Sequence, residues 1–124
     1  MTNRVSNLEE RLLRYAADII RLVERLLDTR AGNHVGGQLL RSGTAPLPNH
    51  GEARDAESAA DFIHKMKVCL KELRESDRWL RLIQEVPLVA SPAEVTALIS
   101  ETDELIRIFV ASVNTARRNQ EPAS

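Results

Sequence analysis

Histidine and acidic side chains give the first candidate for chemistry in this chain. His64 follows Asp61 by three residues, the spacing at which a helix presents a carboxylate and an imidazole to a di-iron centre. Such a centre needs a second carboxylate–x–x–His pair, and neither His34 nor His50 has a carboxylate three residues before it. We therefore expect no metal site, and we interpret Asp61 as a first-turn residue favoured by the helix dipole.

Nucleophilic catalysis has no better basis in the sequence. Cys69 is the only cysteine, and it falls one helical turn from Met66 and Leu73, where a buried thiol behaves as a small, inert hydrophobe. Ser42 and Ser76 have no evident base beside them. The stretch GNHVGG lacks the lysine of a phosphate-binding loop. The sequence predicts a protein that is not an enzyme and carries no cofactor.

Polar and aromatic residues of one helical stretch form a further group. Glu72, Glu75 and Trp79 occupy successive turns. The two carboxylates either face a neighbouring helix, where Arg41 would pair with them, or stay exposed. For Trp79, the only tryptophan, we expect packing in the core or at an interface. The candidate structural or interface residues are Arg41, Asn49, Glu52, Phe62, Glu72, Glu75 and Trp79.

Arginines are the remaining candidates, as contacts to nucleic acid. The 17 basic residues nearly balance 18 acidic ones, giving a net charge of −1, so no global field draws the chain to nucleic acid or acidic membranes. Aromatic residues make up only 3%, which argues against base stacking. Runs such as RLVERLLDTR are typical of a solvated, salt-bridged face, the alternative being a local patch formed on assembly. The candidate nucleic-acid contacts are Arg11, Arg14, Arg21 and Arg25.

Helices must position these side chains. Apolar residues recur every three or four positions over residues 5–29, which predicts an amphipathic helix. Ser6 and Glu9 form a candidate capping box at its start. A weaker second helix follows, because Gly36 and Gly37 cost helix propensity but would let another helix approach closely. The residues that widen the apolar stripe of the first helix are Leu13, Ile20 and Leu27.

Two clearer helices complete the chain. The third is capped at Ser58 and ends before Pro87. The fourth has Ser91 as its cap, Pro92 in the first helical position and Glu94 as the capping-box partner. Four amphipathic helices with short connections predict an all-α fold, an antiparallel up-down four-helix bundle.

The second helix contains a segment that should break it, APLPN. A proline inside a helix costs about 3 kcal/mol, so an undistorted helix through Pro46 and Pro48 is not expected, and the residue before each proline is biased towards an extended conformation. Asn49, with Glu52 in the box position, would cap a restarting helix and leave both prolines outside it. The sequence predicts a kinked or broken second helix near residues 44–49.

The four predicted helices indicate how the chain is divided into a domain and a tail. Residues 1–118 form a single domain, and residues 119–124 form a flexible tail. The apolar faces are wider than a two-position seam, which leaves apolar area for a partner, most simply another copy of the chain. No apolar run approaches the ~20 residues that span a bilayer, and the start MTNRVSNLEE is too polar for a signal peptide. We expect a cytoplasmic protein that does not act at membranes.

The run over residues 32–83 resembles the four-helix-bundle family named for genes in intervening sequences of bacterial 23S rRNA. The resemblance rests on QLLRSGT, on the Asn-x-x-Glu-Ala of residues 49–53, on AES, on DFIHKMKV and on LKELRES-x-x-WL. It implies a small cytosolic bacterial protein that assembles as a ring-like homo-oligomer, often a pentamer, and that has no catalytic residues. A related branch comprises accessory proteins of diversity-generating retroelements, which engage RNA and a reverse transcriptase.

We therefore expect a non-enzymatic, homo-oligomeric helical scaffold or adaptor, with a pentamer as the assembly that the resemblance favours. The alternative is an RNA-associated accessory protein that works with a nucleic-acid enzyme or a ribosomal component. An oligomer would align the four candidate arginines into rings, which the net charge of one chain conceals.

Overall fold

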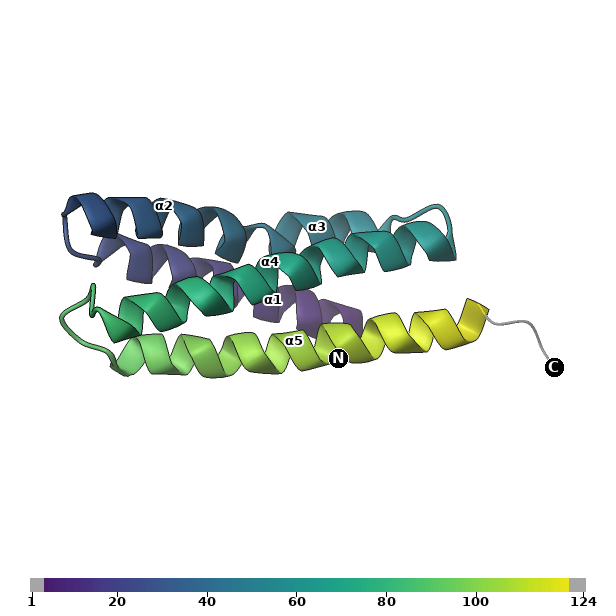
Figure 1. The fold of residues 1–124 in the computed structure, drawn as a ribbon. Helices are drawn as coiled ribbons and strands as arrows, with labels where there is room; N and C mark the ends of the chain where they lie inside the picture. Colours follow the sequence, from purple (N-terminus) through teal and green to yellow (C-terminus); the bar gives the residue numbers. More distant parts are fainter. Residues whose placement is uncertain (1–3, 121–124) are drawn as a thin grey trace.

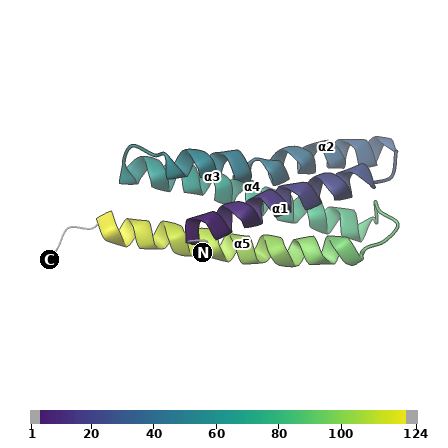
Figure 2. The same ribbon diagram turned by 180° about the vertical axis from the view of Figure 1, so that it is seen from behind.

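In the computed structural model, which describes the backbone of residues 4–120 and the side chains of residues 7–120, the chain is an all-α bundle (Figure 1). The helices are α1 (Arg4–Glu24), α2 (Arg30–Thr44), α3 (Pro46–Arg54), α4 (Ala59–Glu85) and α5 (Ala93–Gln120). Helices α2 and α3 lie end to end and together form one side of the bundle, as the view from behind also shows (Figure 2). The predicted antiparallel four-helix bundle with a broken second helix is confirmed.

The break in the second helix falls at Ala45. This residue keeps helical angles (φ −60°, ψ −37°), and Pro46 opens α3 in the first helical position. The first N–H groups of a helix have no partner within it, so both Pro46 and Pro48 are tolerated in this first turn. Asn49 lies inside α3 and its N–H donates to the Ala45 carbonyl at 3.2 Å. The predicted cap at Asn49, with its partner Glu52, is therefore wrong, as is the extended conformation expected before Pro46.

The first helix is shorter than predicted, because α1 ends at Glu24. The following residues form a connection in which the Leu27 N–H donates to the Leu88 carbonyl at 2.9 Å, tying the α1–α2 turn to the α4–α5 turn. Thr29 then caps α2, where its hydroxyl accepts a hydrogen bond from the Gly32 N–H at 3.0 Å. This cap had not been predicted, since the apolar stripe continued across it.

The capping predictions for the later helices have mixed outcomes. The Ser58 hydroxyl accepts from the Asp61 N–H at 3.0 Å, so the predicted cap of α4 is confirmed. Helix α5 begins at Ala93, one residue later than predicted. The Glu94 carboxylate binds Arg25, the residue after α1, so its oxygens serve this ion pair and not the predicted capping box.

The two ends of the described chain also differ from expectation. Ser6 lies inside α1, which already includes Arg4, so Ser6 is not at the helix start where a capping box would act. Helix α5 runs to Gln120, two residues into the predicted tail, and residues 121–124 lie outside the described residues. No helix within residues 4–120 is long and apolar enough to cross a bilayer.

A polar layer crosses the otherwise apolar core. The Tyr15 hydroxyl of α1 hydrogen-bonds the Thr102 hydroxyl of α5 at 2.7 Å, and the Ser76 hydroxyl of α4 donates to that of Ser42 in α2 at 2.8 Å. All four side chains are buried. A buried hydroxyl without a partner costs about 1–3 kcal/mol, so these two pairs penalise any sliding of one helix along the next. The largest fully buried aliphatic side chains around this layer are Leu12, Ile19, Leu22, Leu39, Met66, Leu73, Leu80, Ile83, Val95 and Leu105.

Close approach of α1 and α2 depends on glycine. A Cβ at Gly43 would lie 2.8 Å from two carbons of Ile19, closer than side-chain carbons pack. At Gly36 it would lie 3.2 Å from Leu26 Cδ1, whereas at Gly37 nothing lies within 4 Å. The predicted close approach is therefore confirmed at Gly36 but not at Gly37, and Gly43 is the tightest of the three positions.

Candidate functional site

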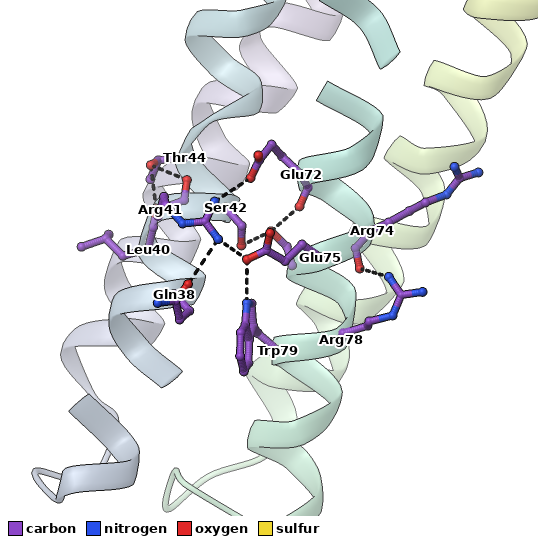
Figure 3. Close-up of polar contacts among 11 residues, drawn as sticks. Gln38, Leu40, Arg41, Ser42, Thr44, Glu72, Arg74, Glu75, Arg78 and Trp79 are labelled. Atoms are coloured by element: carbon purple, nitrogen blue, oxygen red, sulfur yellow. Dashed lines mark hydrogen bonds and ion pairs between the residues drawn. The ribbon is translucent and has the colours of Figure 1, made fainter. Parts of the chain in front are cut away.

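A polar cluster on the outside of the bundle joins α2 to α4 (Figure 3). The Arg41 guanidinium donates to Glu72 Oε2 at 3.0 Å, binds Glu75 and reaches the Gln38 side-chain oxygen at 3.3 Å. The Trp79 indole N–H donates to Glu75 Oε2 at 3.0 Å. We call Gln38, Arg41, Glu72, Glu75 and Trp79 the Arg41 cluster. Of the two alternatives for the carboxylates, the structure shows the pairing with Arg41.

Local sequence explains why these side chains meet. Glu72, Glu75 and Trp79 recur at helical spacing on α4, so they share the face that turns towards α2. Arg41 lies in the last turn of α2, where the helix dipole favours a cation. Beneath it, the buried Ser42–Ser76 hydrogen bond holds the same two helices, and Figure 3 shows Ser42 directly behind the guanidinium. The cluster therefore lies over a point where the register of α2 against α4 is fixed.

The charges of the Arg41 cluster hold its side chains in fixed orientations and do not activate any of them for a reaction. Two carboxylates face one guanidinium, whose side chain is 50% exposed. Ion pairs that are this exposed contribute about 0–1 kcal/mol to stability. The ring of His34 meets that of Trp79 edge-on, with centroids 6.2 Å apart. Arg41, Glu72 and Glu75 are bound to one another, and the Ser42 hydroxyl beneath them is buried and hydrogen-bonded to Ser76, so the arrangement holds its side chains in place and presents no free nucleophile paired with a base.

The residues first considered for chemistry do not converge. Burial raises the pKa of the Cys69 thiol to about 12, so it is protonated near neutral pH and a poor nucleophile. Its sulfur lies 3.8 Å from the Pro46 carbonyl oxygen. His64 is exposed on α4. Within residues 4–120 no three His, Cys, Asp or Glu side chains are grouped so that they could hold a metal ion.

The arginines considered as nucleic-acid contacts mostly pair with acids. Arg11 makes two hydrogen bonds to Glu101 of α5, at 2.7 and 3.2 Å, and these raise the pKa of its guanidinium. Arg14 is exposed and makes none of the ion pairs found among residues 7–120. The three ion pairs are Arg11–Glu101, Arg21–Asp18 and Arg25–Glu94. Two of the four arginines are thus directed into the seam between α1 and α5, which reduces the positive charge available to phosphates.

The remaining candidate interface residues lie away from the Arg41 cluster. Glu52 of α3 pairs with Lys65 of α4 at 3.5 Å. Phe62 is partly buried and packs against the core near the start of α4. Asn49 is half-buried within α3. A role of any of these residues at an interface stays a prediction.

An exposed apolar strip lies on α1 and the turn that follows it. Leu13, Ile20 and Leu27 are exposed by 57%, 44% and 45%. Leu13 and Ile20 are seven residues apart, about two helical turns, so they lie on one face of α1, and Leu27 lies in the turn that follows α1. We call these three residues the α1 strip. They widen the apolar stripe of the first helix, as the sequence predicts, and the neighbouring helices leave them exposed.

A second exposed apolar surface lies at the end of α4. Leu82 is 42% exposed and Val86 is 57% exposed. These two residues, which we call the α4 patch, follow Trp79 by one and two helical turns. Helix α2 also leaves one large apolar side chain, Leu40, 38% exposed. Large apolar side chains therefore reach the surface on three different helices.

Comparison with known proteins supports the fold. No family model matches the chain, and no curated protein matches it. A solved crystal structure shares this bundle. It is a protein of unknown function from the S23 ribosomal protein family of Bacteroides thetaiotaomicron, with 27% identity and a TM-score of 0.79 over 86% of this chain and 97% of that one. The chain is thus similar in sequence and structure to a protein of that family, which supports the family resemblance at this coarser level and brings no activity with it.

Proposed function

We propose that this chain is a non-enzymatic helical scaffold or adaptor that acts as a homo-oligomer in the cytoplasm. The observation that carries the proposal is the α1 strip. Single exposed leucines are ordinary on protein surfaces, but Leu13 and Ile20 lie on one face of α1 at the seven-residue spacing by which helices associate, and Leu27 exposes a third large apolar side chain in the turn beyond the helix. Burying such side chains contributes about 1.5–3 kcal/mol each when burial is complete. Covering the α1 strip with another copy would remove it from water.

The position of the other exposed apolar residues favours a ring. The α1 strip and the α4 patch lie on different helices, so one copy can present both to different neighbours. Contacts between unlike surfaces generate closed rings when the rotation between copies closes. A ring of five copies, the size that the family resemblance implies, is our proposed assembly.

The Arg41 cluster supports a scaffold more than an enzyme. Its charged groups bind one another across α2 and α4, and this holds Arg41 at the surface and the partly buried Trp79 beside it. Rigid side chains of these two types are enriched at protein interfaces. We therefore propose that the cluster presents a partner-binding surface on the assembled protein.

Light scattering on a sizing column tests the proposal. We expect the natural chain to be oligomeric at micromolar concentration. The double variant Leu13→Gln/Ile20→Gln should be a monomer with unchanged helical content. The matched control Glu10→Gln/Glu24→Gln changes two exposed polar residues of the same helix and should stay oligomeric. A natural chain that is monomeric at this concentration would refute the proposal.

The alternative function, an RNA-associated accessory protein, receives less support from the geometry. Three of its four candidate arginines would have to exchange acidic partners for phosphates. A mobility-shift assay with structured RNA at low and high salt tests it, because phosphate contacts weaken steeply with salt. Absence of a shift at low salt would remove this alternative.

A further inference from the structure

Helix α3 has nine residues, and it is separated from α2 by the break at Ala45 and from α4 by residues 55–58. It packs mainly against α4 and also contacts α1. The residues that it buries are Pro46, His50 and Ala53, and its Leu47 packs against the core while partly buried. Among these four side chains, only the imidazole of His50 can take up a proton.

His50 joins three helices. Its side chain is only 5% exposed, and its Nδ1 lies 3.5 Å from Glu9 Oε1 of α1. Its ring meets that of Phe109 in α5 edge-on, with centroids 6.0 Å apart and an angle of 72° between the rings. In a neutral imidazole, Nδ1–H can donate to the Glu9 carboxylate, and the burial of the ring disfavours a charge on it.

The charges around His50 come from α1 and from α3 itself. Glu9 is shared, because Arg54 of α3 binds its other carboxylate oxygen. Arg54 therefore offsets the negative charge that would otherwise stabilise an imidazolium. The ion pair between Lys65 of α4 and Glu52 of α3 joins α3 to α4, and α5 contributes the ring of Phe109 where it meets the imidazole.

These surroundings lower the pKa of His50. Burial is the largest cause, Glu9 opposes it through its hydrogen bond and charge, and Arg54 adds to it. A proton on the imidazole is therefore less stable when α3 is docked than when α3 is released into water. Docking is unaffected well above the ordinary histidine pKa of about 6.5 and is weakened progressively below it.

We propose that His50 is a pH-sensitive switch: protonation of its imidazole weakens the docking of α3 and releases it from α1, α4 and α5 while the long helices stay packed. The break at Ala45 lets α3 move without unwinding α2. Pro46 and Pro48 have no backbone N–H, so neither contributes a hydrogen bond that would hold α3 to α2 across the break. The switch lies within one chain and does not depend on how copies of the chain assemble.

Release of α3 would uncover a reporter that the chain already contains. Cys69 is 0% exposed, and its sulfur lies against the carbonyl of Pro46, the first residue of α3. It is the only cysteine in the chain. The rate at which a thiol reagent reaches Cys69 therefore measures how often α3 is undocked, provided that opening is fast relative to labelling.

Labelling with a pyridyl disulfide between about pH 7.5 and pH 5 tests the proposal, with each rate divided by that of an unstructured cysteine peptide at the same pH. In the natural chain the ratio should rise as pH falls, by up to about tenfold for each unit that separates the docked and undocked pKa values. His50→Gln should give a ratio independent of pH. The control His64→Gln, which changes an exposed histidine on α4, should keep the full rise. A flat ratio in the natural chain, or an equal rise in His50→Gln, would overturn the proposal.

Hydrogen exchange on the natural chain in its native assembly provides a second test that needs no variant. After correction for intrinsic rates, the amides of α3 should lose protection at acid pH while those of α4 and α5 keep theirs. The imidazole of His50 should titrate below the ordinary histidine pKa of about 6.5 in NMR spectra. Simultaneous loss of protection in all helices, or an α3 that stays protected after His50 has titrated, would contradict a local switch.

Discussion

Two glycines of α2 allow the close packing of α1 and α2 to be measured with matched substitutions. Alanine is favoured over glycine in a helix by about 1 kcal/mol, and at Gly37, where nothing lies within 4 Å of a new Cβ, Gly37→Ala should gain that amount. At Gly43 the new Cβ would lie 2.8, 2.8 and 3.0 Å from carbons of Ile19, a side chain that is 0% exposed. Overpacking of this kind costs about 1–3 kcal/mol.

The difference between the two variants isolates the packing cost, because the propensity gain is common to both. We expect Gly43→Ala to be less stable than Gly37→Ala by about 1–3 kcal/mol. Urea unfolding followed by far-UV circular dichroism measures this, at one fixed protein concentration because assembly links stability to concentration. Equal midpoints and slopes for the two variants would refute the close approach of α1 and α2 at Gly43.

Two further predictions concern a cap and the polar layer. Ser58→Ala should lose about 1 kcal/mol of unfolding free energy with the cap of α4, whereas Asn49→Ala, inside α3, should lose none; equal losses in urea unfolding would contradict the assigned helix starts. Burial raises the pKa of Tyr15 to about 12, against smaller opposing effects of hydrogen bonds with Thr102 and Ser76. The phenolate absorbance of this only tyrosine should therefore appear near pH 12 and not near 10, and stability should fall above pH 10, where the unfolded chain ionises first; ionisation near pH 10 in the folded protein would contradict the burial of Tyr15.

The helices were predictable because their signals are local. Apolar periodicity and a cap such as Ser58 depend on neighbours in sequence, and the resulting bundle is the one observed. The start of α3 was not predictable in the same way. The rule that excludes proline from a helix does not apply to its first turn, and packing of α3 against α4 decides that the turn begins at Pro46 and not at Asn49.

The side chains of the Arg41 cluster come from α2 and α4, so their contacts depend on how these two helices are aligned. A single sequence specifies that alignment poorly. Pairing of Arg41 with Glu72 and Glu75 was one of two alternatives, and the register of α2 against α4 decided between them. Leu13 and Ile20 widen the predicted apolar stripe, and periodicity shows the width of such a stripe but not how far a neighbouring helix covers it. His50 gave no signal, since its burial follows from the position of α3 and not from its own helix pattern.

Self-association through the α1 strip is the central claim, and sedimentation equilibrium of the natural chain beside Leu13→Gln/Ile20→Gln tests it most directly. The account predicts a closed oligomer of defined mass for the natural chain and a folded monomer for the double variant. A natural chain that sediments as a monomer at micromolar concentration, or a double variant that keeps the full assembly, would contradict it.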